Sequence, residues 1–171
     1  NTVQVGDRVL AAKRIILATG ARPVMPAAWQ ALGERVLTTD TLFEQPDLPR
    51  RIGVVGLGAI GIEMAQALAR LGREVTAFGR GERIASVRDP EVNATLRALL
   101  AKEFTLHTGA DVALSATDGG VRMVAGEASV EVDAVLVAMG RRPNLDDLGL
   151  ETLGLALDER GLPPFDPTTL Q

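Results

Sequence analysis

Residues 51–80 read RIGVVGLGAIGIEMAQALARLGREVTAFGR, and this stretch decides the fold. The apolar run from Ile52 to Val55 predicts a buried strand. Good helix formers from Ala59 to Leu71 predict a helix, which Gly72 would end. Residues Glu74 to Phe78 predict a second strand. The order strand, helix, strand predicts a β-α-β unit with parallel strands.

The turn between the first strand and the helix carries glycines spaced G-x-G-x-x-G. Gly56 would allow a sharp turn, and Gly58 would let a diphosphate approach the backbone. Gly61 would let the helix pack close to the sheet. Ala59 and Ile60 would offer free N–H groups at the positive end of the helix. A glycine-rich turn in another kind of α/β protein is the alternative, but the flanking strand and helix favour a dinucleotide site.

Composition limits the possible functions. The chain has 171 residues, a net charge of −4, 46% hydrophobic residues and 23% charged residues, which suits one globular domain. No basic cluster predicts nucleic-acid binding, and no run of apolar residues is long enough to span a membrane. With no cysteine and one histidine, neither disulfides nor a metal site is expected within these residues. Without a signal sequence, we expect a cytoplasmic protein, and the first residue is not Met, which suggests an excised piece.

The sequence before the β-α-β unit predicts mainly β structure and a connector. Thr2 to Val5 and Arg8 to Ala12 predict a hairpin, followed by a strand from Lys13 to Ala18 and a turn at Ala21 to Pro23. Residues 27–50 predict an irregular connector. In it, Thr39 or Asp40 would cap a short helix through Phe43, and Trp29 is interpreted as a packing residue rather than a ligand contact.

The sequence after the unit predicts a second helix, a meander and a last buried strand. Asp89 as N-cap and Pro90 in the first turn open the helix. Its expected apolar face comprises Val92, Leu96, Leu99 and Leu100. A short strand ends at His107, for which a structural role is favoured over a catalytic one. The remaining expected strands are 111–116, 121–125 and 129–132 in an antiparallel meander, and 134–138 in the parallel sheet.

Two segments with a similar pattern lie on either side of the glycine motif. Residues 18–23 read ATGARP, residues 56–63 read GLGAIGIE, and residues 138–144 read AMGRRPN. In this combination and spacing the chain resembles the pyridine nucleotide-disulfide oxidoreductases, which use FAD and NAD(P)H. Among them it is most similar to dihydrolipoamide dehydrogenases. The resemblance implies a Rossmann-like three-layer α/β domain with a central parallel sheet, two helices and an antiparallel β-meander, flanked by pieces of the FAD domain.

The resemblance also implies a domain division. Residues 1–26 would be FAD-domain strands, 27–50 a connector, 51–144 the NAD(P)H-binding domain, and 145–171 a return segment toward the FAD domain. The family's FAD fingerprint, redox cysteine pair and dimerisation domain have no counterpart in this chain. The expected partners are therefore the rest of its own polypeptide, with FAD and a homodimer in the intact enzyme only. The chain alone is expected to be inactive.

Several site residues follow from the resemblance alone. Glu63 would lie near the nicotinamide and the flavin, while Met139 and Gly140 would lie along the nicotinamide ribose. Thr19 and Gly20 would lie near FAD. No residue of the chain is expected to be catalytic by itself.

The end of the second strand bears on the choice between NADH and NADPH. NAD-binding proteins place an acid there, where this chain has Gly79 followed by Arg80. Arg80, with Arg83 as a second cation, would bind a 2′-phosphate. Against this, NADPH-using relatives often carry Ala at the position of Gly61, and Glu82 could reach the ribose if the loop curls back. NADP(H) is favoured over NAD(H).

Two other functions stay open at this point. The chain could come from a flavoprotein without the cysteine pair, such as a ferredoxin or rubredoxin reductase. It could also be a nucleotide-sensing module that stands alone. The sequence upstream of the chain and the length of the transcript would separate these alternatives.

Overall fold

The computed structural model describes residues 2–159 and 161–169. The chain divides into two compact units. The larger unit runs from Pro23 to Arg141, and the smaller unit combines the residues up to 22 with those from 142 onward.

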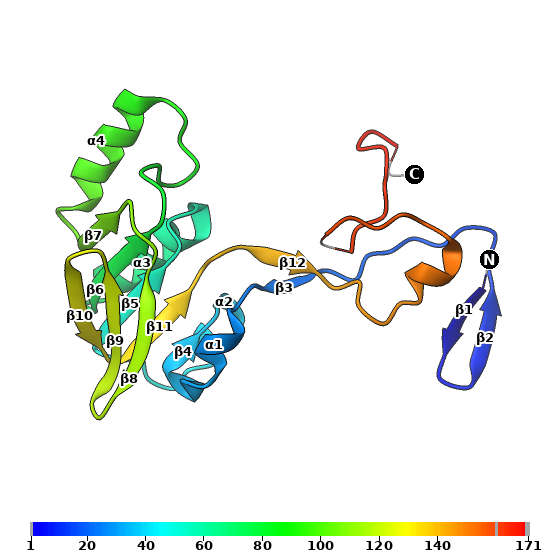
Figure 1. Cartoon of the computed structure of the whole chain (residues 1–171), viewed down its shortest axis with the longest axis horizontal. Coiled ribbons are helices and arrows are strands. Elements are labelled where there is room, and N and C mark those ends of the chain that lie inside the picture. The colour runs from blue at the N-terminus through cyan, green and yellow to red at the C-terminus, as the bar shows by residue number, and fades with distance from the viewer. Residues whose placement is uncertain (1, 160, 170–171) are drawn as a thin grey trace. The chain divides into compact units, whose positions relative to one another are not determined.

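A five-stranded parallel sheet forms the centre of the larger unit (Figure 1). Its strands are β4 (Val36–Leu37), β5 (Arg51–Val55), β6 (Glu74–Gly79), β7 (Thr105–Thr108) and β11 (Ala134–Val137). Their order is β4-β11-β5-β6-β7, and every neighbouring pair is parallel. The predicted strand-helix-strand unit and the last buried strand are confirmed, since β11 lies directly beside β5.

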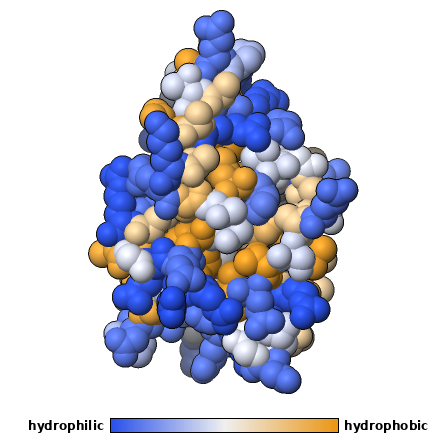
Figure 2. Space-filling view, turned by 90° about the vertical axis from the view of Figure 1, so that its left-hand side faces the viewer, coloured by the Kyte–Doolittle hydropathy of each residue, from blue (hydrophilic) through white to orange (hydrophobic). Residues whose placement is uncertain are grey.

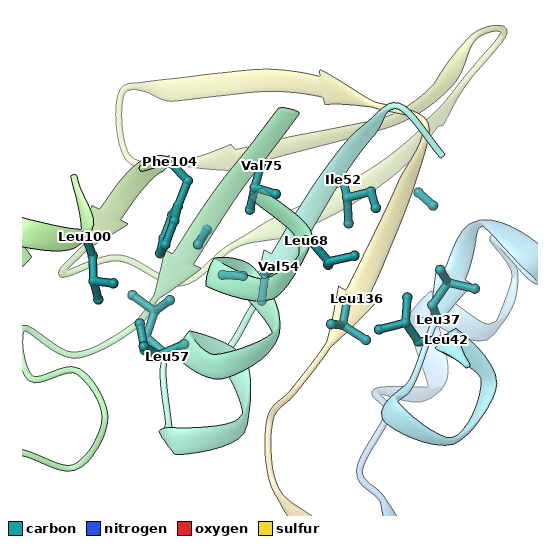
Figure 3. Packing of buried hydrophobic residues seen from close by; sticks show 14 of the residues in the cluster. Leu37, Leu42, Ile52, Val54, Leu57, Leu68, Val75, Leu100, Phe104 and Leu136 are labelled. Carbon is teal, nitrogen blue, oxygen red and sulfur yellow. The ribbon is translucent and has the colours of Figure 1, made fainter. Parts of the chain in front are cut away.

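The two longer helices cover one face of this sheet. α3 (Ala59–Arg70) and α4 (Pro90–Leu100) are the two helices that the sequence predicts, and α1 (Ala27–Gln30) and α2 (Thr39–Leu42) are short. Leu68 of α3 and Leu100 of α4 are buried in one cluster with sheet residues Val54 and Leu136 (Figure 3). The apolar periodicity of the helices thus provides the packing that holds them on the sheet.

An antiparallel meander covers the opposite face. It consists of β8 (Ala113–Thr117), β9 (Gly120–Ala125) and β10 (Ala128–Val132), in the order β10-β9-β8. Met123 and Val132 of the meander are buried in a second cluster with Val55 and Val137 of the sheet. Neighbouring residues of a strand point to opposite faces, so Val54 and Val55 serve different clusters. The predicted three-layer α/β fold is confirmed.

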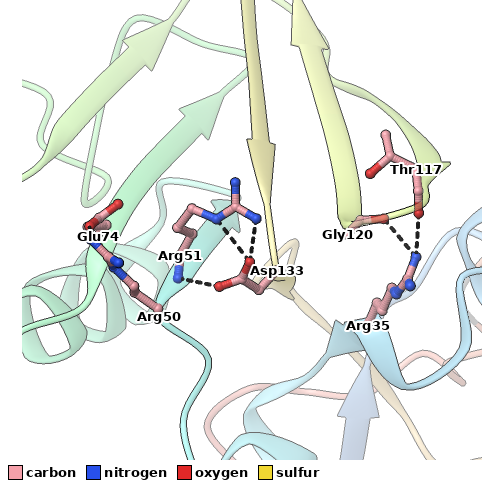
Figure 4. A network of polar contacts seen from close by, with 7 residues as sticks. All are labelled: Arg35, Arg50, Arg51, Glu74, Thr117, Gly120 and Asp133. Atoms are coloured by element: carbon pink, nitrogen blue, oxygen red, sulfur yellow. Dashed lines mark hydrogen bonds and ion pairs between the residues drawn. The ribbon is translucent and has the colours of Figure 1, made fainter.

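Ion pairs and hydrogen bonds fix the ends of the strands (Figure 4). Asp133 accepts hydrogen bonds from the backbone N–H of Arg51 at 2.8 Å and from its guanidinium at 2.5 and 2.9 Å. Arg50 binds Glu74 at 2.7 Å. Arg35 donates to the carbonyls of Thr117 and Gly120 at the β8–β9 turn, at 2.8 and 2.9 Å. These contacts join segments that are far apart in the sequence.

The smaller unit contains an antiparallel hairpin of β1 (Thr2–Val5) and β2 (Arg8–Ala11), as predicted. It also contains the 3-10 helix η2 (Leu150–Leu153), and another 3-10 helix, η1 (Gly33–Arg35), belongs to the larger unit. β3 (Ala21–Pro23) and β12 (Arg141–Pro143) pair as a two-stranded ribbon where the chain passes between the units. Residues 145–159 and 161–169 are otherwise irregular, as the sequence predicts.

Several details of the N-terminal prediction are wrong. Lys13 to Ala18 is not a strand, since these residues have no regular secondary structure and belong to none of the described sheets. Ala21 to Pro23, predicted as a turn, is a strand that pairs with β12. The cap of α2 is Thr38, one residue before the predicted position, and it forms a capping box with Thr41. The segment predicted as an irregular connector contains α1, η1 and β4. These elements are too short to show a hydrophobic periodicity in the sequence.

The apolar face expected for α4 is only partly correct. Asp89 caps the helix as predicted, and Leu100 is buried. Val92 and Leu99 are exposed, however, and the buried residue near the first turn is Asn93, whose amide has hydrogen-bond partners.

Figure 2, which views the molecule from the left-hand side of Figure 1, shows hydrophobic areas among hydrophilic side chains. Among the described residues, no helix is both long enough and apolar enough to cross a bilayer.

Candidate functional site

A pocket of about 750 Å³ lies at the carboxyl ends of the parallel strands in the larger unit. Strands β5, β6 and β11 each contribute their last residues and the loop that follows. The lining residues come from these segments, the loop after β7, the end of β3 and the connector: Pro23, Trp29, Thr39, Val55, Gly56, Gly58, Ala59, Ile60, Phe78, Arg80, Ala110, Asp111, Val112, Val137, Ala138, Met139, Gly140 and Arg141. Open parallel sheets place ligands at this edge.

The glycines of the motif have separate geometric roles. Gly56 has a φ of +102°, and a Cβ there would stand 2.4 Å from the carbonyl oxygen of Ala138. A Cβ on Gly61 would stand 1.8 Å from the carbonyl oxygen of Gly56. A Cβ on Gly58 would meet nothing within 4 Å, because this glycine faces open space in the pocket. Gly56 and Gly61 therefore allow the tight strand-to-helix turn, and Gly58 leaves room for a ligand.

The N-terminus of α3 opens onto the same pocket. Its N-cap, Gly58, supplies no side-chain hydrogen bond, and the first residues of the helix, Ala59 and Ile60, line the pocket. The first N–H groups of a helix lack partners within the helix and carry a partial positive charge. A twelve-residue helix whose N-terminus points into a glycine-lined pocket is suited to bind an anion.

Arg80 adds a full positive charge to the pocket. It follows the last residue of β6, it is exposed, and it lines the pocket. Its guanidinium has no hydrogen-bond or ion-pair partner among residues 2–159 and 161–169. Arg83 likewise has none in that part of the chain, but it does not line the pocket. Gly79 is buried and does not line the pocket, and a Cβ there would stand 2.6 Å from a methyl group of Leu57.

Glu82 does not line the pocket. Its carboxylate accepts hydrogen bonds from Thr108 at 2.9 Å and from Arg97 at 2.7 Å. The Thr108 hydroxyl, followed by Arg97, holds the pKa of Glu82 below its ordinary value. The idea that the loop curls back so that Glu82 reaches the ribose finds no support, since the carboxylate is held by α4 and β7 instead.

The far side of the pocket is formed by the segment after β11. Met139 and Gly140 both line it, and Gly140 has a φ of +105°. The carbonyl of Gly140 accepts a hydrogen bond from the backbone of Val24 at 3.0 Å. Trp29 packs against the buried cluster under the meander, as predicted, and also lines the pocket.

Three residues named from the resemblance lie outside the pocket lining. Glu63 is an exposed residue of α3 whose side chain has no partner among the described residues. In the smaller unit, the carbonyls of Thr19 and Gly20 accept hydrogen bonds from the side chain and backbone of Asn144, at 3.1 and 3.0 Å. The proposed cofactor contacts of these residues stay predictions.

Sequence reasoning missed Thr39, Ala110, Asp111, Val112 and Arg141 as lining residues. Those from 110 to 112 follow β7, and the rule that loops after parallel strands open on one edge could have found them. Thr39 comes from the connector, where the sequence carries no signal for its position. Arg141 binds Asp40 at 3.1 Å at the start of α2.

The surroundings of the potential metal ligands and of the single histidine, in the described part of the chain, bear on two further kinds of site. Among the described residues, no group of three or more His, Cys, Asp or Glu side chains is placed to hold a metal ion. The ring of His107 stacks on that of Phe78, with centroids 4.8 Å apart and an interplanar angle of 21°. This packing fits the structural role that the sequence favoured.

Comparisons with known proteins agree with this architecture. The family model of the pyridine nucleotide-disulphide oxidoreductases matches residues 1–169. Curated relatives include glutathione reductase from Burkholderia cepacia, 39% identical over 94% of this chain and 36% of the relative. Dihydrolipoyl dehydrogenase 3 from Pseudomonas aeruginosa is 38% identical over 92% of this chain and 35% of the relative. The chain spans about a third of the length of these relatives.

Two solved structures show how closely the fold agrees with known proteins. The HOCl-induced flavoprotein disulfide reductase RclA from Escherichia coli has a TM-score of 0.84 and 27% identity, and the match covers 94% of this chain and 38% of that protein. An FAD-dependent pyridine nucleotide-disulphide oxidoreductase from Desulfovibrio vulgaris has a TM-score of 0.75 and 28% identity, over 93% of this chain and 43% of that protein. The chain therefore belongs to the pyridine nucleotide-disulphide oxidoreductase family.

Proposed function

We propose that this chain is the NAD(P)H-binding part of a dihydrolipoamide dehydrogenase-like flavoprotein disulfide reductase. In the intact enzyme, hydride would pass between the nicotinamide and FAD. The observation that carries the proposal is the open space at Gly58, which lies beside the uncapped N-terminus of α3 and inside the pocket. The space would let a diphosphate reach the N–H groups, and the uncapped helix would offer its partial positive charge to the phosphate oxygens.

The pocket residues suit the different parts of a dinucleotide. Gly58, Ala59 and Ile60 would hold the diphosphate, and Met139 and Gly140 would lie along the nicotinamide ribose. The volume of about 750 Å³ is in the range of small-molecule sites. The cofactors supply the redox chemistry when bound, and the residues of this chain bind and orient one of them.

We further propose that the site prefers NADPH to NADH. Arg80 lines the pocket without a partner among the described residues, and no acid follows β6 directly. A guanidinium can bind a 2′-phosphate through paired charged hydrogen bonds. Asp111 is a carboxylate in the lining, but it belongs to the loop after β7, not to the end of β6. In this proposal Arg80 decides the preference and Asp111 does not.

The remaining parts of the proposal concern the whole enzyme. The chain spans about a third of its curated relatives, so the rest of the polypeptide would supply most of the FAD site and the dimer interface. We propose a cytoplasmic homodimer, with Thr19 and Gly20 near FAD and Glu63 near the nicotinamide. By itself, the chain should bind nucleotide without turning over substrate.

Calorimetric titration of the chain with NADPH and NADH tests the proposal. Because a charged hydrogen bond contributes roughly 1.5–3 kcal/mol, NADPH should bind about 10- to 100-fold more tightly. Arg80→Ala should abolish that difference and leave NADH binding unchanged. Arg83→Ala should reduce the difference less, and Asp111→Asn should preserve it. Equal binding of both nucleotides would refute the preference, and binding of neither would refute the site itself.

A further inference from the structure

We propose that Arg97 and Thr108 are positioning residues that set the nucleotide preference, because they hold the Glu82 carboxylate away from the 2′-phosphate site. This inference rests on the proposed function, since it assumes that Arg80 binds the 2′-phosphate. Glu82 is the carboxylate nearest to Arg80 in the sequence, two residues further along the same loop. The position of the Glu82 side chain therefore decides whether its negative charge lies near the 2′-phosphate site beside Arg80.

The carboxylate is held from two elements. Arg97, in the last turns of α4, donates to one carboxylate oxygen of Glu82 at 2.7 Å, and Thr108, at the end of β7, donates to the same oxygen at 2.9 Å. Arg97 also donates to the Thr108 hydroxyl at 2.6 Å, which closes a triangle of hydrogen bonds. The other carboxylate oxygen lies 2.4 Å from the place where a Cβ on Gly109 would stand. The absence of a side chain at Gly109 leaves the space that the carboxylate occupies.

The backbone of the loop is fixed by separate contacts. The side chain of Asn93, 9% exposed, accepts a hydrogen bond from the N–H of Ile84 at 3.0 Å and donates to the carbonyl of Glu82 at 3.2 Å. The side chain of Ile84 is completely buried, and the N–H of Ala85 donates to the carbonyl of Leu57 at 2.8 Å. The loop therefore has anchors that do not involve the Glu82 carboxylate. Arg97 also donates to the Glu82 carbonyl, at 3.5 Å, but Asn93 binds the same carbonyl at 3.2 Å, so loss of Arg97 should release mainly the side chain of Glu82.

A released carboxylate would act on the nucleotide site in two ways. It could pair with the guanidinium of Arg80, which has no competing partner among the described residues, and so remove the charge that binds the phosphate. It would also repel a 2′-phosphate while being able to accept hydrogen bonds from a ribose with free hydroxyls. Both effects lower the affinity for NADPH relative to NADH.

The test compares Arg97→Met with the double variant Arg97→Met/Glu82→Gln. Methionine keeps an unbranched apolar stem in place of the arginine stem, and glutamine removes only the charge. Calorimetry with NADPH and NADH gives the ratio of affinities, and 2′,5′-ADP and 5′-AMP serve as probes of the adenosine end alone. In Arg97→Met the preference for the 2′-phosphate should fall by about 5- to 10-fold, the size of one charge interaction at a partly exposed site.

The double variant separates charge from structure. If the released charge is responsible, Arg97→Met/Glu82→Gln should return the ratio to within about 2-fold of the unsubstituted chain, and Arg97→Lys should keep most of it. An unchanged ratio in Arg97→Met would overturn the inference. An equal fall in the single and double variants would also overturn it, because loop displacement would then be the cause. If the unsubstituted chain shows no preference for NADPH, the proposed function fails first, and the inference fails with it.

Discussion

The carbonyl oxygen of Gly56 lies 1.8 Å from the point where a Cβ on Gly61 would stand. The oxygen belongs to the backbone of the strand-to-helix turn, so it cannot rotate away as a side chain could. Gly56 is fixed in turn, because a Cβ on it would stand 2.4 Å from the carbonyl oxygen of Ala138. The helix α3 thus approaches the sheet as closely as the backbone allows.

Gly61→Ala should destabilise the chain by about 1–3 kcal/mol, the usual cost of overpacking. Alanine would add about 1 kcal/mol of helix propensity, but the backbone clash outweighs it. Urea unfolding followed by circular dichroism gives the free energy of unfolding. Unchanged or higher stability would show that the turn can move, and the close approach would then not explain the glycine.

Gly58→Ala is the matched comparison in the same motif. A Cβ at Gly58 meets no atom within 4 Å, so the free energy of unfolding should fall by less than about 1 kcal/mol, the effect of a poorer N-cap. The methyl group would occupy the space through which a diphosphate reaches the helix. The affinities for NADPH and NADH should therefore both fall by about 10-fold or more, the equivalent of at least one lost charged hydrogen bond. Nucleotide binding that survives this change would place the diphosphate elsewhere.

The main elements of the larger unit could be predicted because their signals are local. The apolar run before Gly56, the helix that ends near Gly72, and the Asp89 cap each come from a few adjacent residues. The segment Lys13 to Ala18 shows the limit of such reasoning. Its sequence suits a strand, but a strand also needs a neighbouring strand that no local pattern specifies, and these residues belong to none of the described sheets.

The candidate site divides in the same way. The motif predicted Gly56, Gly58 and the start of α3, and these residues do line the pocket. The contribution of Trp29 depends on how the connector packs against the meander, which no local pattern specifies. The engagement of Glu82 by Arg97, fifteen residues further on, depends on the contact between a loop and a helix. The sequence alone therefore could not predict which side chains bind the Glu82 carboxylate.

The loop after β6 holds a backbone conformation that glycine would adopt at lower cost. Ala85 and Ser86 have φ angles of 49° and 61°, in the left-handed region that costs a residue with a Cβ about 1–2 kcal/mol. Ser86 is exposed, so a glycine there loses little packing. Ser86→Gly should raise the free energy of unfolding by about 0.5–1 kcal/mol, because relief of strain exceeds the added entropy of the unfolded chain.

Ala67→Gly provides the control for this substitution. Ala67 is exposed within α3, where the backbone is helical, so glycine should lower the free energy of unfolding by about 1 kcal/mol. Urea unfolding of both variants under the same conditions gives opposite signs if the local conformation decides. A loss of stability in both would show that the left-handed turn carries no appreciable strain.

The contact between Asp133 and Arg51 should make stability depend on pH in the acid range. Burial alone would raise the pKa of Asp133, but the hydrogen bonds from the side chain and backbone of Arg51 outweigh it and hold the pKa below its ordinary value. A group whose pKa is lower in the folded state contributes its full stabilisation above the unfolded pKa. That contribution is lost as the pH falls through the folded pKa. The affected range therefore begins near the ordinary pKa of an aspartate, about 4, and extends below it.

Asp133→Asn should unfold at a lower urea concentration than the unsubstituted chain at pH 7, and the difference should shrink as the pH is lowered from about 5 toward 2. The amide can still accept a hydrogen bond from the N–H of Arg51, so the variant tests the charge rather than the bond. Glu44→Gln is the control, since Glu44 is exposed and has no ion pair among the described residues. Other carboxylates with lowered pKa values act equally in both proteins and cancel in the difference. A gap between Asp133→Asn and the unsubstituted chain that stays constant over this pH range would mean that Arg51 and Asp133 do not couple through charge.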